Sequence, residues 1–290
     1  MIVDSHAHYS HKCFENTFRY LAATPEGYTI QEGTRERMRQ AMTAAGIVCT
    51  IEPGISLGSN DALLRYCRDP ENRAFPAVGV HPTRTFREKW RDRKRLEDLV
   101  RTPGVIAVGE TGLDYHHARK DQHRLCQMGW FLYQLNLSQK YHLPLILHIR
   151  DADADAIRIL RLHPARKNGG VVHCFNRGWQ EARQYLEMGF HIGIGGSLLQ
   201  RGEGIGALEE AIRNAPLERI LVETDSPYVL PDCKDTIRPK LLRRTRNSSL
   251  ILPEVIERIA QLKAVEPRQV ELATAQNAIR LFSLPLTPEA

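Results

Sequence analysis

Three observations predict an α/β fold for this chain, a (β/α)8 TIM barrel. Eight short apolar runs alternate with eight amphipathic segments, the runs are rich in Val, Ile and Leu, and the chain has 290 residues. Near-continuous apolar runs are typical of parallel strands buried on both faces, and eight strand–helix units suit a barrel of this length. A doubly wound open sheet is the alternative, but it usually has a glycine-rich turn after its first strand. This chain has His-Ala-His-Tyr-Ser-His there.

The predicted elements alternate along the chain. Strands are expected at residues 2–6, 47–52, 75–80, 104–109, 144–148, 170–174, 190–195 and 219–224. The 3.6-residue periodicity predicts helices near 34–45, 59–69, 92–101, 118–141, 151–162, 178–188, 203–214 and 253–264. Residues that end helices follow several of these segments, namely Gly46, Pro103, Pro144, Gly189 and Pro216. Ser59 and Asp151 are suitable N-caps.

Nothing in the composition divides the chain. It contains no low-complexity segment, no Gly/Ser linker and no strong internal repeat. We therefore expect one barrel domain over residues 1–284. Residues 285–290 contain two prolines and are expected to form a loose tail.

The composition also limits the setting of the protein. Hydrophobic residues make up 42%, enough for a sizeable core, yet no apolar run reaches the roughly 18 residues of a membrane span. The first residues lack the basic and apolar regions of a secretory signal. None of the six cysteines forms a CxxC pair. We therefore expect a reduced, cytoplasmic protein that does not contact a membrane.

The net charge of +6 is concentrated in two blocks. Residues 84–101 hold eight basic and four acidic side chains, and residues 234–246 hold six basic and one acidic, so the rest of the chain sums to −3. The blocks follow the third and eighth predicted strands and begin in loops at the same end of the barrel. They suit a phosphate-rich partner, although ordinary surfaces carry such clusters too. Residues 92–101 are predicted as an outer helix, so part of this charge faces water.

The first candidate ligands are His6 and His8, which end the first strand. Alternate side chains of a strand share a face, so the two imidazoles can chelate one metal ion. A chance pair of surface histidines is the other interpretation.

Four more polar residues lie at or near strand ends: Glu110, His148, His173 and Asp225. Singly, each has an ordinary explanation, such as a loop acid, a core histidine or a turn residue. Together with the first pair they lie on strands whose C-terminal ends converge on one mouth of a barrel, where active sites form. Six such ligands indicate a divalent metal site, expected to hold two ions bridged by a carboxylate. A structural zinc site is not favoured, because the cysteines are scattered.

Several segments, taken in order, resemble the TatD-related family of metal-dependent deoxyribonucleases within the amidohydrolase-like superfamily. They are 3–8 (VDSHAH), 77–82 (AVGVHP), 107–116 (AVGETGLDYH), 144–160 (PLILHIRDADADAIRIL), 171–175 (VVHCF), 221–231 (LVETDSPYVLP) and 277–282 (NAIRLF). The resemblance implies a barrel of the metallo-dependent hydrolase type that uses two divalent ions, Mg²⁺, Mn²⁺ or Zn²⁺.

The resemblance also implies residue roles. His6, His8, Glu110 and Asp225 would hold one ion; Glu110, His148 and His173 would hold the other. Glu110 and Asp225 would be the catalytic carboxylates, with Asp225 orienting or deprotonating the attacking water.

Four further residues are expected at the substrate phosphate: His81, Arg150, Asn176 and Arg177. Arg150 offers a bidentate guanidinium, although an ion pair with Asp151 or Asp155 is a serious competing interpretation. Asn176 and Arg177 stand where the family often has Ser or Thr followed by Gly, which leaves the substrate preference open.

The predicted function is that of a metal-dependent phosphodiester hydrolase, a 3′→5′ exonuclease on single-stranded DNA. Aromatic residues near the mouth could stack bases or belong to the core: Tyr9, Phe14, Tyr115, Phe175, Trp179 and Tyr228. A D-aminoacyl-tRNA deacylase or another metal-dependent hydrolase is the first alternative, with tRNA as partner. A subunit of a larger nucleic-acid-handling complex is the second. Glu110 in place of a bridging lysine disfavours lactonases and phosphotriesterases.

Overall fold

The computed structural model describes residues 1–118 and 120–287 and contains one eight-stranded parallel sheet. Its strands, in spatial order, are β1 (Ile2–Asp4), β4 (Ile47–Pro53), β5 (Ala74–Val78), β6 (Ala107–Asp114), β7 (Leu145–Arg150), β8 (Gly170–Val172), β9 (His191–Ile194) and β10 (Ile220–Val222). The segments after β1 and β10 close the ring. The Ser5 N–H donates to the Val222 carbonyl at 3.0 Å, and the His8 N–H donates to the Ser226 carbonyl at 2.8 Å. The predicted (β/α)8 barrel is confirmed.

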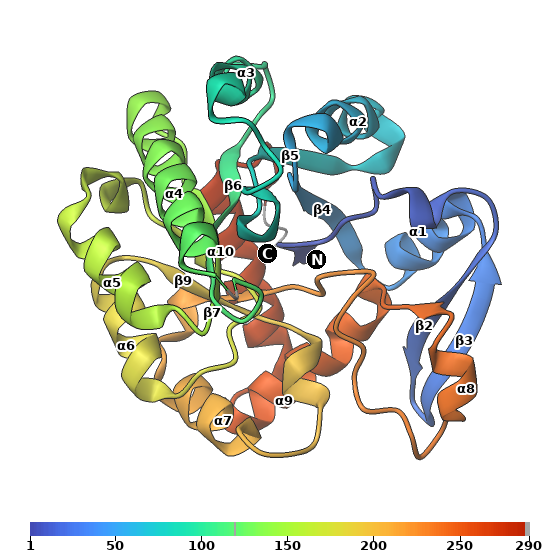
Figure 1. Cartoon of the computed structure of the whole chain (residues 1–290). Helices are drawn as coiled ribbons and strands as arrows, with labels where there is room; N and C mark the ends of the chain where they lie inside the picture. The colour runs from blue at the N-terminus through green and yellow to red at the C-terminus, as the bar shows by residue number, and fades with distance from the viewer. Residues whose placement is uncertain (119, 288–290) are drawn as a thin grey trace.

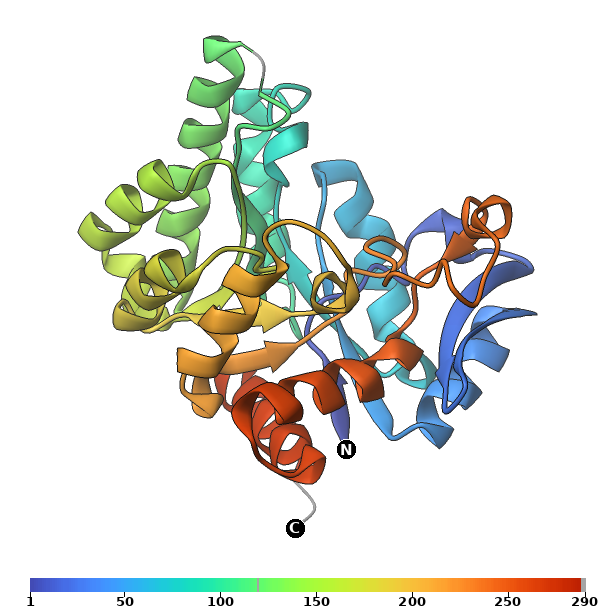
Figure 2. The same cartoon turned by 90° about the horizontal axis from the view of Figure 1, so that it is seen from below.

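Helices surround the strands, as Figures 1 and 2 show. The α-helices are α1 (Arg35–Ala44), α2 (Leu57–Arg68), α3 (Arg93–Val100), α4 (Asp121–Tyr141), α5 (Asp153–Leu162), α6 (Trp179–Glu187), α7 (Ile205–Asn214), α8 (Pro239–Leu242), α9 (Leu252–Lys263) and α10 (Pro267–Phe282). The eight predicted helices correspond to α1–α7 and α9. Position 119 of the predicted helix 118–141 lies outside the described residues.

The two predicted N-caps are wrong in detail. Ser56, not Ser59, caps α2, because Ser59 is the third residue of a capping box in which the two side chains satisfy each other's backbone N–H groups. Ala152 occupies the cap position of α5 and makes no side-chain cap bond. Asp151 instead adopts a positive φ of 52° and pairs with Arg177.

Strand β6 extends further than the sequence predicts, from Ala107 to Asp114 rather than from 104 to 109. The apolar run stops at Gly109, but the backbone goes on pairing with β7, from Thr111 opposite Leu147 to Asp114 opposite Arg150. The approach is close at Gly112, where φ is +141° and an added Cβ would lie 2.1 Å from the His148 carbonyl oxygen. Glu110 therefore lies inside a strand rather than after it.

A small second sheet was not predicted. It consists of the antiparallel hairpin β2 (Phe18–Thr24) and β3 (Gly27–Gly33), with β11 (Thr245–Arg246) parallel to β2. It lies beside the barrel next to α1 and α8 (Figure 1). Most of β3 is only partly buried, so it lacks the continuous apolar run by which the barrel strands are recognised.

Helix α10 also escaped prediction, and it closes the floor of the barrel, the end opposite the C-terminal ends of the strands. Its buried positions include Thr274, Asn277 and Ala278, which are too small or too polar to give a clear hydrophobic period. The Asn277 amide donates to the Leu217 and Ile220 carbonyls, each at 2.9 Å, at the start of β10. Figure 2 shows the helix in red beside the N-terminal strand.

The division into a domain over 1–284 and a tail over 285–290 stays a prediction. Within the described part, Leu284 is buried and Leu286 packs partly against the floor. Residues 288–290 of the predicted tail lie outside the described residues. In the part of the chain that the structure describes, no helix has the length and apolar character needed to span a membrane.

Candidate metal centre

The six predicted ligands meet at the mouth of the barrel. His6 and His8 follow β1, Glu110 lies in β6, His148 lies in β7, His173 follows β8, and Asp225 follows β10. A cavity of about 180 Å³ opens above them. Its lining comprises His8, Ile55, His81, Thr83, Arg84, Glu110, His148, His173, Asp225 and Tyr228.

One half of the cluster consists of His6, His8 and Asp225. The two Nε2 atoms lie 3.2 Å apart, and Asp225 Oδ1 lies 3.6 Å from His6 Nε2 and 3.3 Å from His8 Nε2. Glu110 Oε2 approaches the same atoms, at 3.5 Å from His6 Nε2 and 3.9 Å from His8 Nε2.

The other half gathers around the second oxygen of Glu110. Its Oε1 lies 2.8 Å from His148 Nδ1, 2.8 Å from His173 Nε2 and 3.3 Å from His81 Nε2. The His148 Nδ1 atom is itself 3.0 Å from His173 Nε2 and 3.2 Å from His81 Nε2. His81, predicted at the substrate phosphate, thus lies within the ligand cluster.

The donor set suits divalent cations. Neutral imidazoles that face one another through ring nitrogens cannot all satisfy their lone pairs by hydrogen bonding, because each ring carries only one N–H. Here several such nitrogens converge with the carboxylates of Glu110 and Asp225, and imidazole with carboxylate is a donor set that binds zinc and similar divalent ions. Each oxygen of Glu110 faces a different half of the cluster.

The electrostatics favour ionised carboxylates. Burial opposes the ionisation of Glu110, but the imidazoles of His81 and His173 hold its pKa well below the ordinary value. Burial also opposes the ionisation of Asp225, and a hydrogen bond from His8 helps to lower the pKa of Asp225 nonetheless. Reciprocally, Glu110 raises the pKa of His173 well above its usual range against the effect of burial. Glu110 and Asp225 are therefore ionised within the cluster of imidazoles.

Asp225 is held in an unusual backbone conformation. Its φ is +53°, in the left-handed region that non-glycine residues rarely adopt. Its N–H donates to the His6 carbonyl, and its own carbonyl accepts from the Tyr228 N–H, both at 2.8 Å. These two bonds fix the carboxylate opposite the histidines of the β1 end.

Three buried acids that the sequence analysis missed support the ligands. Asp114 Oδ2 lies 3.1 Å from His148 Nε2, and Glu223 Oε1 lies 3.6 Å from His173 Nδ1. Glu52 accepts the N–H groups of the loop after His8, from Tyr9 at 3.0 Å and from the next residue at 2.9 Å. Such partners orient ligating rings. A signal existed, since each acid lies at or just after the C-terminal end of a barrel strand.

Glu223 has space because of a glycine. A Cβ added at Gly193 of the neighbouring strand would lie 2.2 Å from Glu223 Oε2. The Cys174 N–H also donates to Glu223 Oε1. Cys174 is only partly buried, because β8 ends at Val172 and Cys174 adopts a positive φ of 48°.

The remaining predicted substrate residues lie outside the lining of the metal pocket. Arg150 ends β7 with an exposed side chain. Asn176 lines a separate cavity of about 150 Å³. Arg177 pairs with Asp151 at 2.8 Å and Asp153 at 3.2 Å. Their roles at the substrate stay predictions.

The residues that do line the pocket include Thr83 and Arg84, which the sequence analysis did not single out as site residues. They belong to a short helical turn after β5, capped by the His81 side chain. Of the six aromatics expected near the mouth, Tyr9, Phe14 and Phe175 are buried in the core. Tyr228 is 49% exposed and lines the pocket.

A (β/α)8 barrel with a buried cluster of histidines and carboxylates at its C-terminal mouth defines a metal-dependent hydrolase. Solved structures share this fold. YJJV, a TatD homologue from Escherichia coli K12, superposes with a TM-score of 0.82 at 24% identity, covering 98% of each chain. A TatD family hydrolase from Entamoeba histolytica gives a TM-score of 0.78 at 22% identity, covering 97% of each chain.

Sequence comparison defines the family. The TatD related DNase family matches residues 3–283, so the chain belongs to this family and the predicted resemblance is confirmed. The 3′-5′ ssDNA/RNA exonuclease TatD of Edwardsiella piscicida is 35% identical over 240 residues, which cover 83% of this chain and 90% of that one. The uncharacterized metal-dependent hydrolase YcfH of Escherichia coli K12 is 35% identical over 211 residues, or 72% and 73%. The prediction of a hydrolytic enzyme is likewise confirmed.

Proposed function

We propose that this chain is a metal-dependent phosphodiesterase that releases nucleotides from the 3′ end of single-stranded DNA. The observation that carries the proposal is the position of Glu110, whose two oxygens face two separate groups of ligand atoms. The similarity to the Edwardsiella piscicida relative, a 3′-5′ ssDNA/RNA exonuclease, supports the substrate class and the polarity.

Two divalent ions fit the two halves of the cluster. His6, His8, Asp225 and one oxygen of Glu110 would hold the first; the other oxygen of Glu110 would hold the second with His148 and His173. His81 stands beside the second group. When bound, such ions acidify a water molecule and neutralise charge on the phosphodiester.

The protein supplies orientation and proton transfer. Asp225 is ionised, so its carboxylate can orient the attacking water and accept its proton at an oxygen facing the cavity. Arg84 lines the same cavity and can donate to a non-bridging phosphate oxygen. The His148 Nε2–H donates a hydrogen bond to the Asp114 carboxylate, which holds the His148 ring in place during this step.

The test is a product ladder from end-labelled DNA and RNA oligonucleotides in the presence of Mg²⁺, Mn²⁺ or Zn²⁺. We expect single nucleotides released from the 3′ end, and loss of the release in Glu110→Gln. The matched control is Glu203→Gln, an exposed acid in the loop before α7, which should cleave like the wild type. Absence of cleavage with all three ions would refute the proposal. Hydrolysis of D-aminoacyl-tRNA without oligonucleotide cleavage would establish the alternative.

A further inference from the structure

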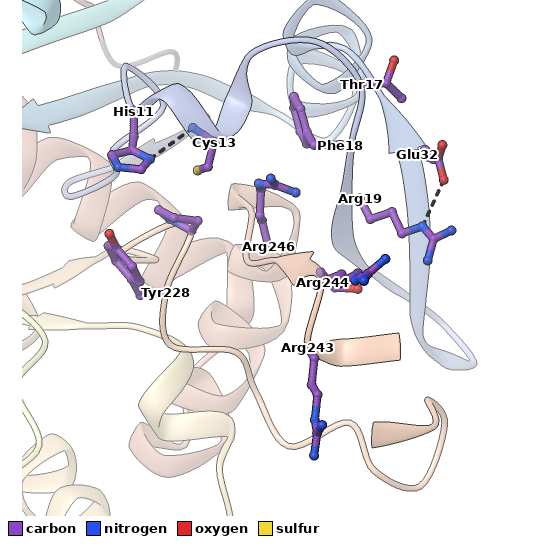
Figure 3. A pocket seen from close by; sticks show the side chains of 12 residues that line it. His11, Cys13, Thr17, Phe18, Arg19, Glu32, Tyr228, Arg243, Arg244 and Arg246 are labelled. Carbon is purple, nitrogen blue, oxygen red and sulfur yellow. Dashed lines mark hydrogen bonds and ion pairs between the residues drawn. The ribbon is translucent and has the colours of Figure 1, made fainter. Parts of the chain in front are cut away.

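A second, larger cavity lies beside the metal pocket. It has a volume of about 670 Å³ and lies between the hairpin β2–β3, the loop after β1 and the segment around β11. Its lining comprises His11, Cys13, Thr17, Phe18, Arg19, Glu32, Pro227, Tyr228, Arg243, Arg244, Thr245 and Arg246. Figure 3 shows these side chains on both sides of the cavity, and we call it the arginine groove.

The arginine groove carries uncompensated positive charge. Four arginines line it against the single carboxylate of Glu32, and that carboxylate pairs with Arg19 at 3.0 Å. Within residues 1–118 and 120–287, no ion pair involves Arg243, Arg244 or Arg246. Arg243 and Arg244 are exposed, whereas Arg246 lies over the Phe18 ring at 5.5 Å. The basic block predicted at residues 234–246 thus contributes three of these arginines.

The arginine groove and the metal pocket share one residue. Tyr228 lines both cavities, and its ring centroid is 6.2 Å from that of His8. Tyr228 is 49% exposed, so part of its side chain is accessible to a base. A polymeric ligand that occupies the arginine groove would therefore pass Tyr228 before it reaches Glu110.

We propose that the arginine groove binds the backbone phosphates of a single nucleic-acid strand next to the scissile bond, with Tyr228 stacking on a base at the entrance to the metal pocket. The inference rests on the proposed function and extends it by assigning a path to the strand that remains after cleavage. Guanidinium groups match phosphate in charge and geometry. An aromatic ring between a basic groove and the reacting centre is a general device for holding unpaired bases, which a duplex cannot offer.

Binding and cleavage can be measured separately. Fluorescence anisotropy of a 5′-labelled single-stranded oligonucleotide, in chelator, reports binding without cleavage. We expect Arg243→Ala/Arg244→Ala to bind at least 10-fold more weakly at low salt. The slope of log K against log salt is negative, and each lost phosphate contact on a single strand reduces its magnitude by about 0.7. Loss of two contacts therefore predicts a slope less steep by about 1.4. Tyr228→Ala should weaken binding without changing that slope.

The matched control is Arg65→Ala/Arg68→Ala, which removes the same charge from the last turn of α2. These side chains are exposed and line neither cavity. Mn²⁺ affinity and thermal midpoint of each variant should match the wild type, which excludes misfolding. Equal loss in both double variants, or an unchanged slope in Arg243→Ala/Arg244→Ala, would overturn the inference.

Two results separate this inference from the proposed function. A wild type that binds through the arginine groove in chelator but never cleaves oligonucleotides would refute the nuclease while the strand-binding groove stands. Tighter binding of folded tRNA or duplex DNA than of single strands would overturn the assignment of a single strand.

Discussion

The mouth and the floor of the barrel are built from the same strands but differ in chemistry. At the mouth, histidines and carboxylates face one another. At the floor, a compact apolar cluster from the strands packs against α10. Its members are Val3, Cys49, Ile51, Ala77, Ala107, Ile146, Val171, Leu221, Ala275, Ala278, Phe282 and Leu284. Strands β1, β6, β7, β8 and β10 thus contribute to the apolar floor at one end and carry or precede candidate ligands at the other.

Two strands show how abrupt the change is. Ile146 of β7 belongs to the floor cluster, and His148 two residues later belongs to the metal centre. Val171 and His173 repeat the arrangement at β8. Alternate residues of a strand share a face, so the next residue on the same face, two positions along the strand, already belongs to the site instead of the core.

Asp225→Asn should impair the chemistry at the mouth of the barrel without destabilising the fold. Asparagine tolerates the left-handed conformation of this position, so the fold should persist. Loss of the proton acceptor should lower the rate of oligonucleotide cleavage by about 10²–10⁴-fold. Single-turnover kinetics at saturating metal measure this loss. A rate within a few-fold of the wild type would remove Asp225 from the chemistry.

Phe282→Ala should destabilise the floor of the barrel without changing the residues at the mouth. The ring is buried against the strands from the end of α10, so truncation should lower the free energy of unfolding by about 3–5 kcal/mol. Urea denaturation measures the loss. Leu162→Ala, on an 83% exposed side chain at the end of α5, is the control and should change it by less than about 0.5 kcal/mol. If Phe282→Ala were as stable as this control, the packing of the Phe282 ring of α10 against the strands would not contribute to the free energy of unfolding.

Asp114→Asn changes a residue that contacts the predicted ligand His148, and leaves the predicted ligands themselves unchanged. Its carboxylate contacts His148 Nε2 at 3.1 Å and His117 Nδ1 at 2.9 Å. We expect metal affinity to fall by about 10–100-fold in calorimetric titrations. His117→Ala removes only the half-exposed partner and should leave the affinity within about twofold. Equal losses in the two variants would mean that the contact with His148 is not what matters.

His191→Gln should give the smallest effect and concerns a histidine remote from the metal centre. Burial, with a contribution from nearby Arg219, lowers the pKa of His191 to about 4. The unfolded chain therefore binds a proton that the folded protein excludes between about pH 6.5 and 4. Stability is complete above pH 6.5 and falls as pH decreases through this window, by about 1–2 kcal/mol between pH 8 and pH 5. In the variant, this part of the pH dependence of urea denaturation should disappear; an unchanged profile would contradict the assignment.

The convergence of the candidate ligand side chains could be predicted from the sequence, because the C-terminal ends of all the strands of a barrel meet at one mouth. His148 and Asp225 needed only to lie near strand ends to be brought together. The buried acids Asp114 and Glu223 were missed, because a carboxylate in an apolar run shows no partner until the neighbouring strand is in place.

The peripheral elements were less predictable. The hairpin β2–β3 is partly exposed, and its pairing with β11 joins segments more than 200 positions apart. The direction of the Arg150 side chain depends on the turn after β7, which periodicity does not describe. Loops and edges follow tertiary contacts rather than local pattern.

The closure of the barrel has a consequence during synthesis of the protein. Ser5 and Val222, whose hydrogen bonds close the ring between β1 and β10, lie 217 positions apart. The predicted ligands His6, His8 and Asp225 lie on either side of this closure. A nascent chain emerging from a ribosome therefore holds only part of its reactive centre until nearly all of it has been synthesised. The candidate metal centre is therefore complete only after the segment around Asp225 has emerged.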